Sequence, residues 1–110
     1  MINKEIITET DSVYNYMDGD KVLGYLEIRS VDGVIDIMNL FVHEDNRRQG
    51  VATALMNEMI EKEDYSRIML EVNENNIEAI RLYTKLGFQE INLRERYYGE
   101  DTAIIMEKVK

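Results

Sequence analysis

The sequence predicts a mixed α/β (α+β) fold, in which a mostly antiparallel sheet of about six to seven strands carries two main helices. Three observations support this fold. Alternating apolar segments dominate the first half, a helical period replaces them after residue 50, and a strand then separates two helical segments. The predicted order is β-β-β-β-α-β-α-β-β. A chain of 110 residues fits one domain, which we expect to span residues 1–110.

The first half has the pattern of an antiparallel meander. The alternation of apolar and polar residues is clearest in the third and fourth of its four predicted strands. Asp32-Gly33 between them favours a two-residue hairpin turn, because these residues readily adopt positive φ angles. Asp18-Gly19-Asp20 marks an earlier turn. The four predicted strands are Lys4–Thr10, Val13–Met17, Val22–Val31 and Val34–His43.

The second half alternates helices with strands. Val51, Leu55 and Met59 recur at helical spacing and predict the first helix. A side-chain cap and a later glycine predict the limits of the second helix. The expected elements are a helix from about Gly50 to Lys62, a strand Arg67–Val72, a helix capped by Asn75 or Asn76 and stopped at Gly87, and strands Phe88–Arg96 and Thr102–Val109.

The composition argues against several classes of function. Acidic residues number 22 against 13 basic ones, and a net charge of −9 disfavours nucleic acid and anionic membranes as partners. The absence of cysteine removes disulfides, thiolate metal sites and a cysteine nucleophile. His43 is the single histidine, so we expect no metal site. We find no secretory leader and no membrane-spanning run, and we expect a cytoplasmic location.

A polar loop rich in hydrogen-bond donors precedes the first predicted helix. Arg47 and Arg48 are the one adjacent basic pair in this acidic chain. Gly50 and Ala52 are small enough for a phosphate to approach the backbone, where free N–H groups and the helix dipole favour an anion. The alternative is a solvated helix start, and the spacing alone does not decide between the two. No Walker motif is present, because no Gly-Lys-Ser or Gly-Lys-Thr follows.

Two sets of residues in this chain resemble a known family. Arg47-Arg48-Gln49-Gly50-Val51-Ala52 is similar to the Arg/Gln-x-x-Gly-x-Gly/Ala signature of the GNAT superfamily of acetyl-CoA-dependent N-acetyltransferases. The combination with later residues resembles the bacterial ribosomal-protein-alanine N-acetyltransferases, from about Val22 to Lys108. The later residues are Leu70-Glu71-Val72, Asn76, Ala79-Ile80, Leu82-Tyr83, Leu86-Gly87-Phe88, Arg94, Tyr97-Tyr98 and Ala103-Ile104-Ile105-Met106.

The resemblance implies acetyl-CoA as co-substrate and suggests where it binds. The backbones of Leu40, Phe41 and Val42 would bind the pantetheine arm and the acetyl group, and an N–H near Phe41 would serve as oxyanion donor. Asn76 would contact the cofactor where the second helix begins. The loop residues expected to bind the cofactor, mainly its pyrophosphate, are Arg47, Arg48, Gln49, Gly50, Val51, Ala52 and Thr53.

Acetylation of an amine needs a base for the amine and an acid for the leaving thiolate. Glu71 alternates away from Leu70 and Val72, lies near the end of its strand and matches the family's catalytic glutamate, so it is the candidate base, acting through water. The alternative is a solvent-facing strand residue. Tyr83 is the candidate acid, because its phenolic O–H can protonate a thiolate. The alternative is a tyrosine of the core.

The acceptor is the open part of this interpretation. Arg94, Tyr97 and Tyr98 are candidate substrate-binding residues together with Arg96, because the matching loop lies over the acceptor in the resembling enzymes; a packed hairpin is the alternative. The family normally carries two helices between its first two strands, which wall the acceptor site, and here only a turn fits. The acceptor is then a protein N-terminal amine or side-chain amine, or a small polyamine-like cation. A catalytically silent acetyl-CoA-binding module and a homodimer that replaces the wall are left open.

Overall fold

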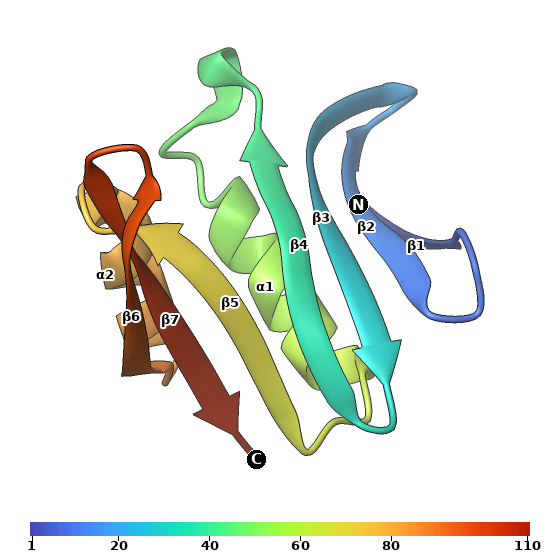
Figure 1. The fold of residues 1–110 in the computed structure, drawn as a ribbon. Helices are drawn as coiled ribbons and strands as arrows, with labels where there is room; N and C mark the ends of the chain where they lie inside the picture. The colour runs from blue at the N-terminus through green and yellow to red at the C-terminus, as the bar shows by residue number, and fades with distance from the viewer.

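Seven strands form one mixed sheet, and two helices cover one of its faces in the computed structural model (Figure 1). The structure describes the backbone of residues 1–110 and every side chain except those of Arg96, Tyr97 and Tyr98. The strands lie in the order β1-β2-β3-β4-β5-β7-β6. The elements are β1 (Ile2–Ile6), β2 (Asp11–Asp18), β3 (Lys21–Val31), β4 (Val34–Val42), α1 (Val51–Lys62), β5 (Arg67–Asn73), α2 (Ile77–Lys85), β6 (Gln89–Tyr98) and β7 (Asp101–Val109).

The order of elements predicted from the sequence is confirmed, with a short 3-10 helix, η1 (Glu44–Asn46), added before α1. Some strand ends differ from the prediction. The first strand ends at Ile6 instead of Thr10, because Thr8 Oγ1 accepts hydrogen bonds from the N–H groups of Thr10 and Asp11 at 3.3 and 3.0 Å. These side-chain bonds close a turn and compete with continued strand pairing.

Local turn and cap chemistry explains three of the boundaries that were predicted correctly. Asp32 and Gly33 have φ angles of 51° and 82°, as the hairpin turn between β3 and β4 requires. Asn76 Oδ1 accepts a hydrogen bond from the Ala79 N–H at 3.2 Å and caps α2. Gly87, with a φ of 95°, allows the chain to leave that helix in the left-handed region.

The hydrophobic core lies between the two helices and the sheet face that they cover. Alternate residues of the central strands point into it and pack against α1 and α2. Burying one such side chain contributes about 1.5–3 kcal/mol. Fully buried apolar residues include Leu26, Ile28, Ile35, Leu55, Met56, Met59 and Ile68.

Neither helix of the described structure is long and apolar enough to cross a membrane.

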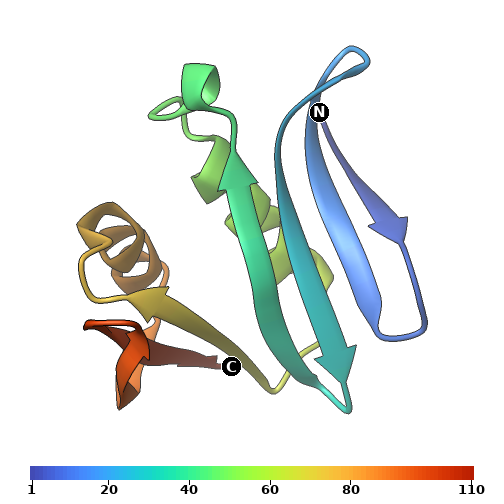
Figure 2. The ribbon, with the colours of Figure 1, turned by 45° about the horizontal axis from the view of Figure 1, so that its top comes forward.

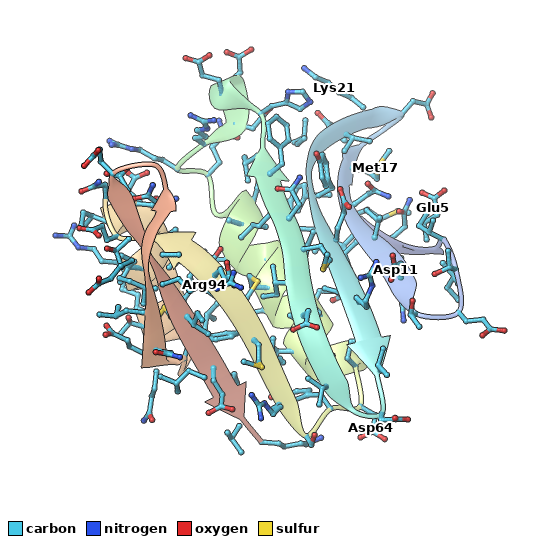
Figure 3. The ribbon with its side chains drawn as sticks, in the orientation of Figure 1. Glu5, Asp11, Met17, Lys21, Asp64 and Arg94 are labelled. Atoms are coloured by element: carbon cyan, nitrogen blue, oxygen red, sulfur yellow. The ribbon has the colours of Figure 1, made fainter. Side chains whose placement is uncertain are left out.

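The opposite face of the sheet is covered by no helix of the described chain. Its residues alternate with those of the core and combine charged side chains with apolar ones such as Met38, Met69 and Ile105. Side chains on this face, including the labelled Asp11 and Arg94, can be followed in Figure 3. Ion pairs join strands on this face. Arg29 with Asp11 at 2.9 Å and Arg67 with Glu107 at 3.0 Å link neighbouring strands, and Arg94 with Glu71 at 2.7 Å links β6 to β5 across β7.

Strands β4 and β5 diverge after a short parallel pairing. Three residue pairs join them, and the last is Asp36 with Met69. Beyond this point β4 continues along β3 to Val42, and β5 continues along β7 to Asn73 (Figure 2). A bulge at Met38 lies on β4 near the start of the divergence. The backbone groups of β4 that face β5 beyond this point therefore have no partner strand.

Tyr14 is buried against α1 and hydrogen-bonds a carboxylate. The residue is 1% exposed, and its hydroxyl donates to Glu63 Oε2, which also accepts from Lys4 Nζ at 2.8 Å. Burial is the main cause that raises the pKa of Tyr14, and the hydrogen bond and charge of Glu63 add to it. The folded protein therefore holds this phenolic proton more tightly than the unfolded chain.

We expect the free energy of unfolding to fall as the pH rises above about 10. The unfolded tyrosine ionises there while the folded one stays protonated, so stability that is present below the unfolded pKa is lost toward the folded pKa. One such group adds a slope of at most about 1.4 kcal/mol per pH unit. Tyr14→Phe should reduce this slope, and it should cost about 1 kcal/mol at neutral pH through the lost hydrogen bond. Urea unfolding from neutral pH to above about pH 10 measures both the slope and the loss at neutral pH. An unchanged slope in Tyr14→Phe would contradict a raised pKa of Tyr14.

Candidate active site

A cavity of about 600 Å³ lies on the helical side of the sheet, where the end of β4 meets the beginnings of α1 and α2. Ten of the eleven residues predicted to bind the cofactor line it. Gln49 is the eleventh, and its side chain instead donates to the Asp45 carbonyl at 3.4 Å. The ten lining residues are Leu40, Phe41, Val42, Arg47, Arg48, Gly50, Val51, Ala52, Thr53 and Asn76.

One wall of this cavity is the unpaired edge of β4. Leu40, Phe41 and Val42 belong to the part of β4 that has left β5, so the strand can offer backbone groups to an extended ligand in the way that a sheet edge binds a peptide. Gly24 supports this wall from β3. A Cβ atom at Gly24 would lie 2.7 Å from the Phe41 carbonyl oxygen and 3.0 Å from Val51 Cγ1, which leaves no room for a side chain.

A second wall is the first turn of α1. Gly50 is the N-cap, with a φ of 79° and no side-chain cap bond. The first intrahelical hydrogen bond runs from the Ala54 N–H to the Gly50 carbonyl at 2.9 Å. The N–H groups of Val51, Ala52 and Thr53 come before this bond and have no acceptor within the helix. Together with the helix dipole, these N–H groups suit an anion.

The cavity is basic although the chain is acidic. Arg47, Arg48, Arg81 and Lys85 line it, against the single lining carboxylate of Glu78. Arg48 and Glu78 form an ion pair at 3.2 Å, but the two side chains are 85% and 74% exposed, so the pair is weak. Four cations against one anion favour a ligand with several negative charges.

Sequence reasoning missed the contribution of Arg81 and Lys85. They lie one turn apart on α2, and the i, i+4 spacing of two basic residues was the available signal. Asn46 was missed as well, and no sequence pattern marked it. It lines the same cavity, and its side-chain Oδ1 is buried without a hydrogen-bond partner in the described structure. A buried acceptor without a partner fits a ligand that brings a donor.

Tyr83 lies on α2 and lines the basic cavity. The residue is 7% exposed, and its ring centre is 5.8 Å from that of Phe88. Burial raises the pKa of the Tyr83 hydroxyl, so the group stays protonated at neutral pH and is available as a proton donor. This is the protonation state that the candidate acid needs.

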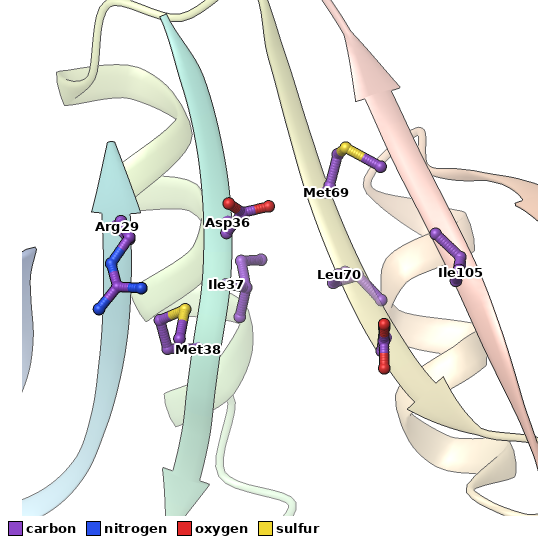
Figure 4. A pocket seen from close by; sticks show the side chains of 8 residues that line it. Arg29, Asp36, Ile37, Met38, Met69, Leu70 and Ile105 are labelled. Carbon is purple, nitrogen blue, oxygen red and sulfur yellow. The ribbon is translucent and has the colours of Figure 1, made fainter. Parts of the chain in front are cut away.

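A second cavity, of about 580 Å³, opens on the uncovered face of the sheet between β4 and β5 (Figure 4). Glu71 lines it, so the candidate base and the candidate acid lie in cavities on opposite faces of the sheet. The Glu71 Oε1 atom accepts a hydrogen bond from Arg94 Nη1 at 2.7 Å. The ion pair orients the carboxylate from β6, which lies beyond β7 in the sheet.

The predicted substrate-binding residues all belong to β6. Arg94 contacts Glu71, as described, whereas the side chains of Tyr97 and Tyr98 lie outside the described residues, as does that of Arg96. His43 packs its ring edge on Phe41, with ring centres 5.1 Å apart. Among the described side chains, no group of three or more His, Asp or Glu residues is placed to hold a metal ion.

Comparisons with known proteins give consistent matches. The model of the acetyltransferase (GNAT) family matches residues 3–88. The chain is 40% identical to the [ribosomal protein bS18]-alanine N-acetyltransferase of Escherichia coli K12, over 64% of this chain and 52% of that protein. It is 32% identical to an N-alpha-acetyltransferase of Saccharolobus solfataricus, over 86% of this chain and 62% of that protein.

A solved structure supports the same likeness. The crystal structure of the ribosomal-protein-S18-alanine N-acetyltransferase from Escherichia coli superposes with a TM-score of 0.88 at 29% identity. The match covers 94% of this chain and 71% of that chain. The present chain therefore reproduces most of the shared fold, while it spans only about half to two thirds of the length of the curated relatives that it matches.

Gly24→Ala tests the wall of the basic cavity. The added Cβ pushes against the Phe41 carbonyl and Val51, and such overpacking costs about 1–3 kcal/mol of stability. Because both neighbours line the cavity, we expect acetyl-CoA to bind about tenfold more weakly, which is about 1.4 kcal/mol. Gly19→Ala is the control, because it also destabilises, through its φ of 61°, but has no neighbouring atom within 4 Å. Calorimetry and thermal unfolding measure both effects, and equal affinities in the two variants contradict the prediction.

Proposed function

The chain belongs to the GNAT family of acetyltransferases, and from this we propose that it transfers an acetyl group from acetyl-CoA to a primary amine. One observation carries the proposal: a basic cavity and a carboxylate-lined cavity flank the gap between β4 and β5 from opposite faces of the sheet. A polyanionic donor and a cationic acceptor can therefore reach the same gap from different sides.

The basic cavity fits acetyl-CoA as the ligand. When bound, this co-substrate supplies an activated acetyl thioester together with several phosphate charges, as it does throughout the family. The N–H groups of Val51, Ala52 and Thr53 would hold the pyrophosphate. The open edge of β4 would bind the pantetheine arm, and the buried Asn46 Oδ1 would accept a hydrogen bond from it.

The proposal assigns the proton transfers to Glu71 and Tyr83. Glu71 takes a proton from the acceptor ammonium through water, while Arg94 holds the carboxylate in place. The amine nitrogen then forms a bond to the acetyl carbon as the carbon–sulfur bond breaks. Tyr83 donates its proton to the departing sulfur, and the second proton lost by the nitrogen replaces it on Tyr83. A backbone N–H near Phe41 stabilises the charge on the carbonyl oxygen. The products are the amide, the free thiol and one released proton.

Two acceptors have support from specific observations. Two of the relatives are named as a ribosomal-protein-alanine N-acetyltransferase and an N-alpha-acetyltransferase, which supports a protein N-terminal amine. The uncovered sheet face supports a small cationic amine, because no helix of the described chain walls the cavity that holds Glu71. Thiol release with N-terminal peptides, polyamines and a blank distinguishes the two classes.

Tyr83→Phe tests the acid. We expect kcat to fall by about 10²–10⁴-fold, the usual contribution of general acid catalysis, while the dissociation constant of acetyl-CoA stays within about twofold. Tyr65→Phe is the matched control, because Tyr65 is also 7% exposed but does not line the cavity. Steady-state kinetics and calorimetry provide the two readouts. Equal losses of turnover and affinity would count against the acid role.

Glu71→Gln tests the base. We expect kcat/KM for the amine to fall about 100-fold near neutral pH, and to recover in part at higher pH, where more of the amine is neutral without help. Glu107→Gln is the control, because it also breaks an arginine pair on the same face but lies outside the cavity. The pH–rate profiles of the two variants test this role, and a Glu71→Gln profile that matches that of Glu107→Gln contradicts it. If the wild-type protein binds acetyl-CoA but releases no thiol with any acceptor, the chain is a binding module instead.

A further inference from the structure

The cavity on the uncovered face combines charged and apolar walls. Asp36 lines it from β4 and Glu71 from β5. Met38, Met69 and Ile105 supply apolar surface in the same cavity (Figure 4). The cavity volume of about 580 Å³ suits a small molecule or the end of a peptide. Glu71 is the candidate base, so whatever fills the cavity next to it is in position to react.

The charges around the cavity are paired, with one exception. Arg29 donates through Nε and Nη2 to the two carboxylate oxygens of Asp11, at 2.9 and 3.1 Å. Glu71 is paired with Arg94. Asp36 makes no hydrogen bond or ion pair with the other described side chains, and its charge acts on Arg29 only as a minor Coulombic effect. Asp36 therefore leaves one negative charge at the cavity without a direct partner.

Strand geometry places Asp36 and Glu71 at the two ends of an apolar strip. Asp36 lies in register with Met69, and Glu71 follows two residues later on β5. With about 3.3 Å per residue along a strand and about 4.8 Å between strands, the Cα atoms of the two acidic residues are at least about 8 Å apart. The diverging strands increase this separation, and Met69 lies beside Asp36, two residues before Glu71 on β5.

We propose that the acceptor is a primary amine that carries a second positive charge on a short apolar spacer. Asp36 binds the second charge, Met69 and its apolar neighbours contact the spacer, and the reacting amine lies at Glu71. The inference rests on the proposed acetyl transfer and makes Asp36 the residue that selects the acceptor. Alkyl diamines and peptides with a basic residue next to the N-terminus share this chemistry.

Binding is tested first, independently of acetyl transfer. The methyl NMR signals of Met38 and Met69 report occupancy of the cavity in protein labelled at its methionine methyl groups. We expect cadaverine to shift these signals saturably and to bind about three- to tenfold more tightly than butylamine, which lacks the second charge. Asp36→Asn should remove the difference. Glu27→Gln should preserve it, because Glu27 is also an acidic residue of the uncovered face but does not line the cavity.

Kinetics then separate this inference from the function on which it rests. We expect kcat/KM to be higher for a diamine than for the matched monoamine, or for an Ala-Lys peptide than for an Ala-Gln peptide, and to depend on Asp36 in either case. The peptide and diamine arms identify the source of the acceptor. Equal transfer to charged and neutral partners in both series, with no effect of Asp36→Asn, overturns the inference but supports the acetyltransferase. Asp36-dependent binding of cadaverine without any transfer supports the cation site but overturns the proposed reaction.

Discussion

The divergence of β4 from β5 is the constraint on which the rest of the site depends. Only three residue pairs hold the two strands together, while each strand continues along a different neighbour. A sheet edge normally exposes backbone donors and acceptors that another chain can pair with. Here the exposed edge lies in the interior of the sheet, between two cavities, and Gly24 allows β3 and α1 to pack closely behind it. The same divergence opens access from both faces.

Charge is divided between the two faces in a way that the net charge of −9 conceals. Basic residues of the α1 loop and of α2 gather around the cavity on the helical side, whereas Asp36 and Glu71 line the cavity on the other side. Such fields attract a polyanion to one entrance and a cation to the other, and each entrance disfavours the wrong ligand. The separation of charge would therefore direct the two substrates to different entrances without a conformational change.

Local signals in the sequence predicted the elements well, because periodicity, the Asp32-Gly33 turn and the Asn76 cap are short-range effects. The candidate phosphate loop before α1 was also proposed from local residues, and the resemblance supplied Glu71 and Tyr83 as candidates. What could not be predicted depends on distant contacts. Asp36 is an ordinary polar strand residue until β5 leaves β4, and Arg81 and Lys85 are a solvated helical face until α2 is placed beside the α1 loop. The roles of the site residues remain predictions.

The uncovered face also bears on self-association. The arginines Arg29, Arg67 and Arg94 are each paired with a carboxylate of another strand of the same sheet, so they are poorly placed to pair with a second molecule. The acidic Asp36 and Glu27 also lie on this face, so two copies that face each other would bring like charges together. A second copy of this chain is therefore a poor substitute for the two helices that the family places here. A cationic acceptor gains from the same negative charge, which favours use of this face for the substrate over use as a dimer interface.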